Sequence, residues 1–324
     1  MRRLLLVAVL ALAGCGGTSG GDRPNETATL LLDFTPNAVH AGIYVASERG
    51  FDEAEGVKLE IRKPSASTDA LKLLQAGRAD MAILDIHDLG IAREKGRDLV
   101  GVMALVQRPL AAVLAQPGIR TPEDLEGKRA GVTGLPSDSA VLRSVVEGAG
   151  GDPDRVRETT IGFEAVKALL ARRVAAATAF WNVEGVALHE KRPRTREFRV
   201  DDYGAPSYPE LVLTVTRTTL EDRPALVRAT IRALQRGYTQ TQNDPESAVS
   251  TMLDREPGLE RASLATQLDA VAPAFTAGAA EFGQLSPVRL RQWAAWDVRF
   301  GILKAPIDVS RAFDTTLVKR PPAP

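Results

Sequence analysis

The sequence predicts an α/β protein built of two similar lobes, each a mostly parallel sheet flanked by helices. Short apolar stretches of strand length alternate with helical periodicity over residues 28–216, and the series starts a second time near residue 110. The remainder, residues 217–318, shows helical periodicity without strands, so we expect it to pack on the first lobe. We therefore assign residues 28–109 to the first lobe and residues 110–216 to the second.

The N-terminal residues 1–15 have the composition of a secretory signal peptide, with two arginines, a short apolar core and small residues before Cys15. Leu-Ala-Gly-Cys resembles a bacterial lipobox, which implies cleavage before Cys15 and a lipid on its thiol. The alternative is a cysteine that lies in a signal peptide by chance. Residues 16–27 are mostly glycine and polar residues, so we expect a flexible tether.

The first lobe opens with an apolar stretch at residues 29–33, followed by the turn-forming residues 34–37 and a helix that ends at Gly50. Open α/β sheets bind ligands at the carboxyl ends of their strands. Residues 33–40 are therefore the expected ligand-facing loop, with Asp33, Phe34, Asn37 and His40 as candidates. The alternative is that Asp33 and Asn37 only cap the helix and that Phe34 belongs to the core.

The next segments of the first lobe alternate in the same way. Strands are predicted at residues 57–62, 80–84 and 99–105, and helices at residues 70–76 and 89–95. The loop after the strand 57–62 contains Ser65, and the strand 80–84 delivers Asp85 to the same sheet edge as the first loop. Both side chains are candidate ligand contacts.

The second lobe repeats this pattern. Strands are predicted at residues 110–116, 129–133 and 174–179, and helices at residues 140–148 and 163–172. Gly134 and Ser137 lie just before the helix 140–148, where backbone N–H groups can receive an anion or a dipole. The segment lacks the Gly-Lys-Ser/Thr ending of a phosphate-binding P-loop.

Two segments carry a family resemblance: LDFTPNAVHAGIYVASERGF at residues 32–51 and AGRADMAI at residues 76–83. The chain resembles the periplasmic solute-binding proteins related to thiamine-pyrimidine synthase over roughly residues 28–310. The resemblance implies a type II periplasmic-binding-protein fold whose lobes close on a ligand. It also implies an aromatic nitrogen heterocycle, either a thiamine pyrimidine precursor such as hydroxymethylpyrimidine or formylaminopyrimidine, or riboflavin.

A strand of alanines ends abruptly in Phe180-Trp-Asn-Val-Glu184. In the family the matching segment faces the cleft, which implies that Trp181, Asn182 and Glu184 stack on and hydrogen-bond a flat ligand. The alternative is that Trp181 packs in the core of the lobe and Glu184 is solvated. Tyr208, just before the next apolar strand, is a candidate for one wall of the cleft.

The C-terminal part of the sequence suggests core packing and offers no candidate ligand-binding residue. Trp293 and Trp296 lie three residues apart on one helix face, a spacing that favours core packing over cofactor binding. We expect the tail, residues 319–324, to be disordered.

Composition excludes several other functions. The 41 basic and 41 acidic residues form no basic patch, so nothing favours a nucleic-acid partner. The three histidines, His40, His87 and His189, share no metal-ligand spacing, so no metal site is predicted. No Gly-x-Ser-x-Gly elbow lies between a predicted strand and helix, and Cys15 is the only cysteine, so neither nucleophilic catalysis nor an internal disulfide is expected.

The synthase chemistry of the family is also expected to be absent. Alignment through Ala79-Asp-Met81 places Leu84 where the Schiff-base lysine of the synthase would stand, and Asp88 where its histidine would stand. The cysteine-rich run would fall near residues 205–210, which contain no cysteine. Leucine cannot form an imine, so we predict a binding protein with no catalytic residue, no cofactor and no metal.

The sequence therefore predicts a monomeric lipoprotein of the cell envelope that delivers a heterocycle to an ABC permease and its ATPase. Two alternatives remain: the same scaffold binding an alkanesulfonate or nitrate-like solute, and a synthase-like enzyme. The predicted ligand-binding residues are Asp33, Phe34, Asn37, His40, Ser65, Asp85, Gly134, Ser137, Trp181, Asn182, Glu184 and Tyr208.

Overall fold

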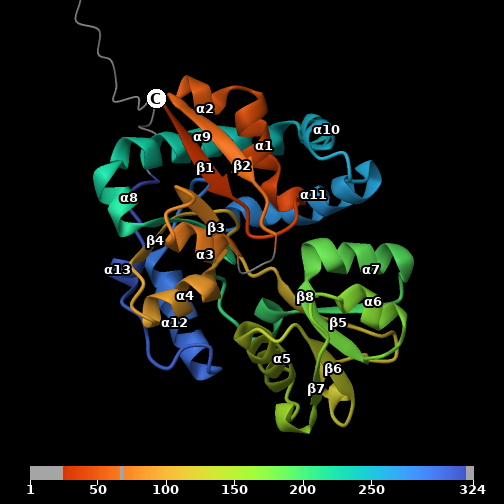
Figure 1. Cartoon of the computed structure of the whole chain (residues 1–324). Helices are drawn as coiled ribbons and strands as arrows, with labels where there is room; N and C mark the ends of the chain where they lie inside the picture. Colours follow the sequence, from red (N-terminus) through yellow and green to blue (C-terminus); the bar gives the residue numbers. More distant parts are fainter. Residues whose placement is uncertain (1–24, 66–68, 319–324) are drawn as a thin grey trace, which may run out of the picture.

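The computed structural model describes residues 25–65 and 69–318, which form two lobes, one above the other in Figure 1. The predicted signal peptide, Cys15, most of the tether and the tail 319–324 lie outside the described residues. Strand β1 begins at Glu26, so the folded part of the chain starts two residues earlier than the predicted start of the first lobe at residue 28.

The first lobe contains a five-stranded sheet in the order β2-β1-β3-β10-β4. Its strands are β1 (Glu26–Leu31), β2 (Val57–Arg62), β3 (Met81–Asp85), β4 (Leu99–Ala104) and β10 (Leu211–Thr216). β1 pairs in parallel with β2 and β3, whereas β10 runs antiparallel to β3 and β4. The prediction assigned residues 211–216 to the second lobe, and this boundary is wrong, because β10 completes the first sheet.

The second lobe contains a five-stranded sheet in the order β7-β6-β8-β5-β9. Its strands are β5 (Ala111–Ala115), β6 (Arg129–Val132), β7 (Arg157–Thr160), β8 (Ala176–Phe180) and β9 (Arg196–Arg199). β5 lies antiparallel between β8 and β9, as β10 does in the first sheet. The two-lobe α/β fold is confirmed, and both sheets are mixed because each contains one such reversed strand.

Helices cover both sheets (Figure 1). The first lobe has η1 (Ala38–His40), α1 (Ala41–Glu48), α2 (Phe51–Ala54), α3 (Asp69–Gln75) and α4 (Ile86–Glu94). The second lobe has η2 (Pro122–Leu125), α5 (Pro136–Gly148), η3 (Pro153–Arg155), α6 (Ala165–Leu170), the π-turn η4 (Trp181–Gly185), α7 (Val186–Lys191) and η5 (Val200–Tyr203). The C-terminal helices are α8 (Arg217–Asp222), α9 (Pro224–Asn243), α10 (Pro245–Arg255), α11 (Arg261–Thr276), α12 (Pro287–Arg299) and α13 (Val309–Ala312).

The loop after β1 is held by close packing of α1 against α9. A Cβ on Gly237 of α9 would lie 2.1 Å from the carbonyl oxygen of Gly42, so no larger residue fits without moving a helix. Tyr238 donates a hydrogen bond of 2.7 Å to the carbonyl oxygen of Val39 in η1. The C-terminal helices therefore fix the backbone from which the first loop projects.

Two chain segments cross between the lobes, one after β4 and one before β10. Glu210, in the second segment, accepts hydrogen bonds on Oε2 from the backbone N–H groups of Leu110 (2.7 Å) and Ala111 (3.1 Å) in the first. The N–H of Leu105 donates to the carbonyl oxygen of Leu211 at 2.8 Å. The two crossings are thus joined into one narrow connection, as expected of a hinge.

The C-terminal helices contact both lobes. α12 is amphipathic and buries Trp293 and Trp296, which confirms the predicted core packing of both rings. Trp296 also donates its indole N–H to Ser144 of α5, at 3.3 Å, across the lobe boundary.

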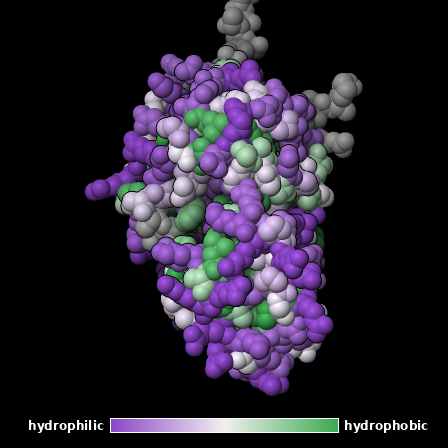
Figure 2. Space-filling model, turned by 90° about the vertical axis from the view of Figure 1, so that its right-hand side faces the viewer, coloured by the Kyte–Doolittle hydropathy of each residue, from purple (hydrophilic) through white to green (hydrophobic). Residues whose placement is uncertain are grey.

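The face shown in Figure 2 is predominantly hydrophilic, with hydrophobic residues confined to separate patches. Within residues 25–65 and 69–318, no helix has the length and apolar character needed to cross a bilayer.

Candidate functional site

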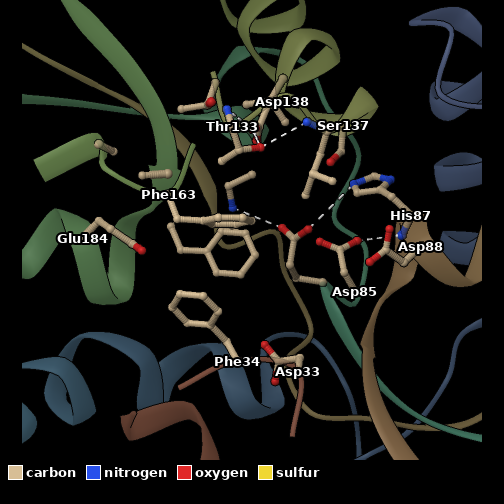
Figure 3. Close-up of a pocket in the computed structure, with 18 of the residues that line it drawn as sticks. Asp33, Phe34, Asp85, His87, Asp88, Thr133, Ser137, Asp138, Phe163 and Glu184 are labelled. Atoms are coloured by element: carbon tan, nitrogen blue, oxygen red, sulfur yellow. Dashed lines mark hydrogen bonds and ion pairs between the residues drawn. The ribbon is translucent and has the colours of Figure 1, made fainter. Parts of the chain in front are cut away.

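A cavity of about 130 Å³ lies between the two lobes, at the strand ends and next to the hinge. The first lobe contributes Asp33, Phe34, Asp85, His87 and Asp88, and the second contributes Thr133, Ser137, Asp138, Phe163 and Glu184 (Figure 3). Glu210 of the hinge also lines it. The site therefore draws on both lobes, as expected of a protein whose lobes close on a ligand.

Asp33 is held in place by a buried polar chain behind it. Its Oδ1 lies 2.8 Å from Nε2 of His40, which is fully buried. Nδ1 of His40 accepts from the backbone N–H of Asn37 at 3.2 Å, and the Asn37 side chain accepts from the N–H of Val39 at 3.0 Å. Asn37 and His40 thus cap η1 and position Asp33, and they do not line the cavity themselves.

Two phenylalanines face each other across the cavity from opposite lobes. The ring centroids of Phe34 and Phe163 are 5.9 Å apart, with an angle of 36° between the rings. Phe163 is 53% exposed, unusual for a large apolar side chain in this molecule. At this separation the two rings contact each other, so a flat ligand would stack on one of them or enter between them only when the lobes open.

Asp138 stands at the start of α5, where a short polar loop follows β6. Its Oδ2 accepts hydrogen bonds from the backbone N–H of Thr133 at 2.7 Å and from the Thr133 hydroxyl. Burial nevertheless raises the pKa of Asp138 above its usual value. Burial likewise raises the pKa of Glu184, and the neighbouring charge of Asp138 adds to this increase.

Acidic groups predominate among the ionisable residues that line the cavity. Six carboxyl groups line it: Asp33, Asp85, Asp88, Asp138, Glu184 and Glu210. Neither lysine nor arginine is among the described lining residues. Burial raises the pKa of Asp85 and Asp88 as well, since the charged forms lose hydration there. The cavity therefore favours a bound group that carries positive charge or many N–H donors.

His87 connects this cavity to the core. Burial alone would lower its pKa, but the carboxylates of Asp297 and Asp85 outweigh that effect and raise the pKa to about 10. Its Nδ1 lies 2.9 Å from Oδ1 of Asp297, and its Nε2 lies 3.2 Å from the hydroxyl of Tyr208. The imidazole is thus surrounded by acidic groups on the inner side of the cavity.

The stability of the unliganded protein should reflect the raised pKa of Asp138. A raised carboxyl pKa stabilises the folded state below the ordinary pKa near 4, and this contribution is lost as the pH rises through the folded pKa. Asp138→Asn stays neutral at every pH. We therefore expect the variant to gain stability relative to the native protein as the pH rises from about 4 to the raised pKa of Asp138, by up to about 1.4 kcal/mol per pH unit.

Denaturant unfolding at several pH values measures this difference. Asp154→Asn is the matched control, because Asp154 forms an exposed ion pair with Arg143. The stability difference between this variant and the native protein should change much less with pH. A difference between Asp138→Asn and the native protein that stays constant with pH would contradict the raised pKa.

The structure corrects the prediction for Trp181. Its side chain is 2% exposed, and Nε1 donates a 2.9 Å hydrogen bond to the carbonyl oxygen of Pro109. The guanidinium of Arg199 lies 4.0 Å above the ring. β8 ends at Phe180, which lines the cavity, and the π-turn η4 that follows directs Trp181 away from it. Trp181 is a core residue, which was the stated alternative.

Four other predicted residues also lie off the cavity wall. Tyr208 is fully buried behind His87 and forms no wall of the cleft. Asn182 is buried too, and neither side-chain atom has a hydrogen-bond partner among the described residues. Ser65 is exposed and donates to Asp69. Gly134, with a φ of 103°, allows the turn between Thr133 and Leu135, both of which line the cavity.

Asp33, Phe34, Asp85, Ser137 and Glu184 do line the cavity, as predicted, although no contact with a ligand tests them. The lining residues that were missed include all of these polar or aromatic ones: His87, Asp88, Thr133, Asp138, Phe163 and Glu210. Asp88 and Asp138 could have been predicted from the sequence, since each is an acidic residue in the first turn of a helix that follows a strand.

The fold is that of the periplasmic binding proteins. The structure of the periplasmic aliphatic sulphonate binding protein SsuA from Escherichia coli matches with a TM-score of 0.72 and 16% identity, over 88% of this chain and 96% of that one. This similarity describes the fold alone.

The chain belongs to the NMT1/THI5-like family, whose model matches residues 37–248. It is 34% identical to the formylaminopyrimidine-binding protein of Halalkalibacterium halodurans over 78% of each chain. It is 28% identical to the 4-amino-5-hydroxymethyl-2-methylpyrimidine phosphate synthase of Legionella pneumophila, over 71% of this chain and 74% of that protein.

Proposed function

We propose that this chain is the solute-binding component of an ABC importer and captures a flat, amino-substituted nitrogen heterocycle of the thiamine pyrimidine precursor type. One observation carries the proposal: an acidic cavity between two lobes, free of lysine and arginine among its described lining residues, with Phe34 and Phe163 facing each other across it. The family relationship to a formylaminopyrimidine-binding protein supports the same class of ligand.

The chemistry of the cavity fits an aminopyrimidine. Exocyclic amino groups donate N–H bonds to carboxylates, and a carboxyl group can share a proton with a ring nitrogen. Glu184 and Asp138 of the second lobe are suited to these bonds, while Phe34 and Phe163 are suited to stacking. An alkanesulfonate or nitrate would meet six carboxyl groups, and the one cationic side chain among the described lining residues, His87, is already paired with Asp297, so the anion alternative is disfavoured.

The room in the cavity favours a ligand with one ring. The cavity volume of about 130 Å³ is small. A pyrimidine with short substituents therefore needs less opening of the lobes than the much larger riboflavin. Riboflavin would require the lobes to open further.

The enzyme alternative lacks its nucleophile. Leu84, at the position expected for the Schiff-base lysine, lines the cavity as an apolar residue. No lysine is among the other described lining residues, so these residues offer no amino group that could form an imine with a cofactor. Binding and delivery to a permease therefore account better for this site than synthesis.

Calorimetric titration against a panel of ligands tests the function. Formylaminopyrimidine and hydroxymethylpyrimidine should bind with one site per chain, and an alkanesulfonate and nitrate should not bind. Mass spectrometry of small molecules released from the denatured, purified protein provides an independent identification. Tight binding of a sulfonate, or binding of riboflavin alone, would replace the proposed ligand.

We also propose that Cys15 anchors the protein to the membrane through a lipid. Cys15→Ser removes the thiol, so we expect the variant to be lost from the membrane fraction of a bacterial host, while a Thr18→Ala control stays there. Fractionation followed by immunoblotting measures this. Unchanged membrane retention of Cys15→Ser would refute the anchor without affecting the proposed ligand.

A further inference from the structure

Three potential metal ligands meet at the inner end of the cavity. Carboxylate oxygens of Asp85 and Glu210 and a ring nitrogen of His87 all lie within 4.8 Å of one another. Nε2 of His87 and Oε1 of Glu210 are 3.7 Å apart. Two ligands bound tetrahedrally at about 2.1 Å from a zinc ion lie roughly 3.4 Å apart, so this pair needs to move only slightly.

The core orients His87 as a metal ligand. Its Nδ1 faces both carboxylate oxygens of Asp297, at 2.9 and 3.0 Å, and the indole N–H of Trp293 lies 3.2 Å from the same nitrogen. Asp297 is fully buried. A carboxylate on one ring nitrogen leaves the other nitrogen available for a metal, an arrangement that recurs behind zinc-bound histidines. Nε2 is the nitrogen on the side of Glu210, and it also lies 3.2 Å from the Tyr208 hydroxyl. A bound metal would replace that contact and the proton on this nitrogen.

Glu210 supplies an independent indication of a missing ligand. Its side chain is 1% exposed, and Oε2 is used by the backbone N–H groups of Leu110 and Ala111. Oε1 has no hydrogen-bond partner among the described residues. A buried carboxylate oxygen without a donor is costly, and a cation would satisfy it.

We propose that Asp85, His87 and Glu210 bind a divalent metal ion of the zinc class at the inner end of the cavity. One imidazole nitrogen and two carboxylates suit a borderline metal such as Zn²⁺ better than Mg²⁺ or Ca²⁺. All three residues line the cavity, so a fourth position of the metal faces the space that a solute would occupy. The site does not depend on the identity of that solute, because its ligands all come from this chain.

Zinc titration of the metal-free native protein tests the site, with no heterocycle present. We expect one zinc per chain, and at least tenfold weaker binding for Asp85→Asn and for Glu210→Gln. Both variants are chosen to preserve the fold. Asparagine still caps α4, as Asp85 does through the N–H of His87, and the glutamine oxygen still accepts from Leu110 and Ala111.

His189→Gln is the matched control, because His189 is an exposed histidine on α7 outside the cavity. It should bind zinc as the native protein does. Should a variant fail to fold by circular dichroism, the visible spectrum of the native protein with Co²⁺ decides: intense d–d bands indicate a four-coordinate site. Weak six-coordinate bands, unchanged zinc affinity in Asp85→Asn and Glu210→Gln, or loss of binding in His189→Gln would each overturn the proposal.

Discussion

Replacing Trp181 by alanine is expected to lower the free energy of unfolding by about 3–5 kcal/mol. The ring is buried in the second lobe, donates a hydrogen bond to Pro109 and lies beneath Arg199. Its removal leaves a cavity and an unpaired carbonyl group, so the melting temperature of the unliganded protein should fall by several degrees. Thermal unfolding followed by circular dichroism measures the change.

Phe163→Ala separates this effect from ligand stacking. Phe163 is half exposed, so its removal should change the unliganded melting temperature little and weaken binding of the heterocycle instead. If Trp181→Ala leaves the melting temperature unchanged and abolishes binding, Trp181 lies in the cleft after all, and the orientation of η4 in this structure is wrong.

Glu184→Gln is expected to weaken heterocycle binding by about ten- to a hundredfold. The substitution keeps the size of the side chain and removes its charge. A buried hydrogen bond to a charged group contributes on the order of 1.5–3 kcal/mol, which corresponds to that range in affinity. Because burial raises the pKa of Glu184, the empty protein should tolerate glutamine well, and the loss should appear in binding rather than in stability.

Calorimetric titration of Glu184→Gln with formylaminopyrimidine measures this loss. Glu164→Gln is the control, since Glu164 lies in the same lobe and pairs with Lys167 at an exposed position. Native affinity in Glu184→Gln would mean that the carboxyl group only fills space in the second lobe.

The sequence predicted the strands and the loops that follow them, because apolar stretches and turn residues are local signals. Asp33, Asp85 and Ser137 reach the cavity for that reason: each lies at the carboxyl end of a strand or in the loop that follows it. The pairing partners of β10 were not predictable, because an apolar strand is compatible with either sheet. β10 belongs to the first sheet because the chain crosses back to the first lobe at Glu210, just before this strand.

Side-chain direction after a strand was the second limit. β8 ends at Phe180, and the π-turn η4 then turns Trp181 inward and returns Glu184 to the side of Phe180. Composition alone could not show this, since an aromatic residue suits both a cleft and a core. His87 and Glu210 were missed for a related reason, because their neighbours Asp297 and Leu110 are distant in sequence.

The position of β10 between β3 and β4 also has a consequence for synthesis of the protein on the ribosome. The second sheet is built from a continuous segment, β5 to β9, and can form as soon as residue 199 has emerged. The first sheet has an unfilled place beside β3 until β10 follows, so the lobe that begins earlier in the chain finishes folding later. During that interval the edges of β3 and β4 are unpaired, and the nascent chain is most exposed to aggregation and to chaperone binding.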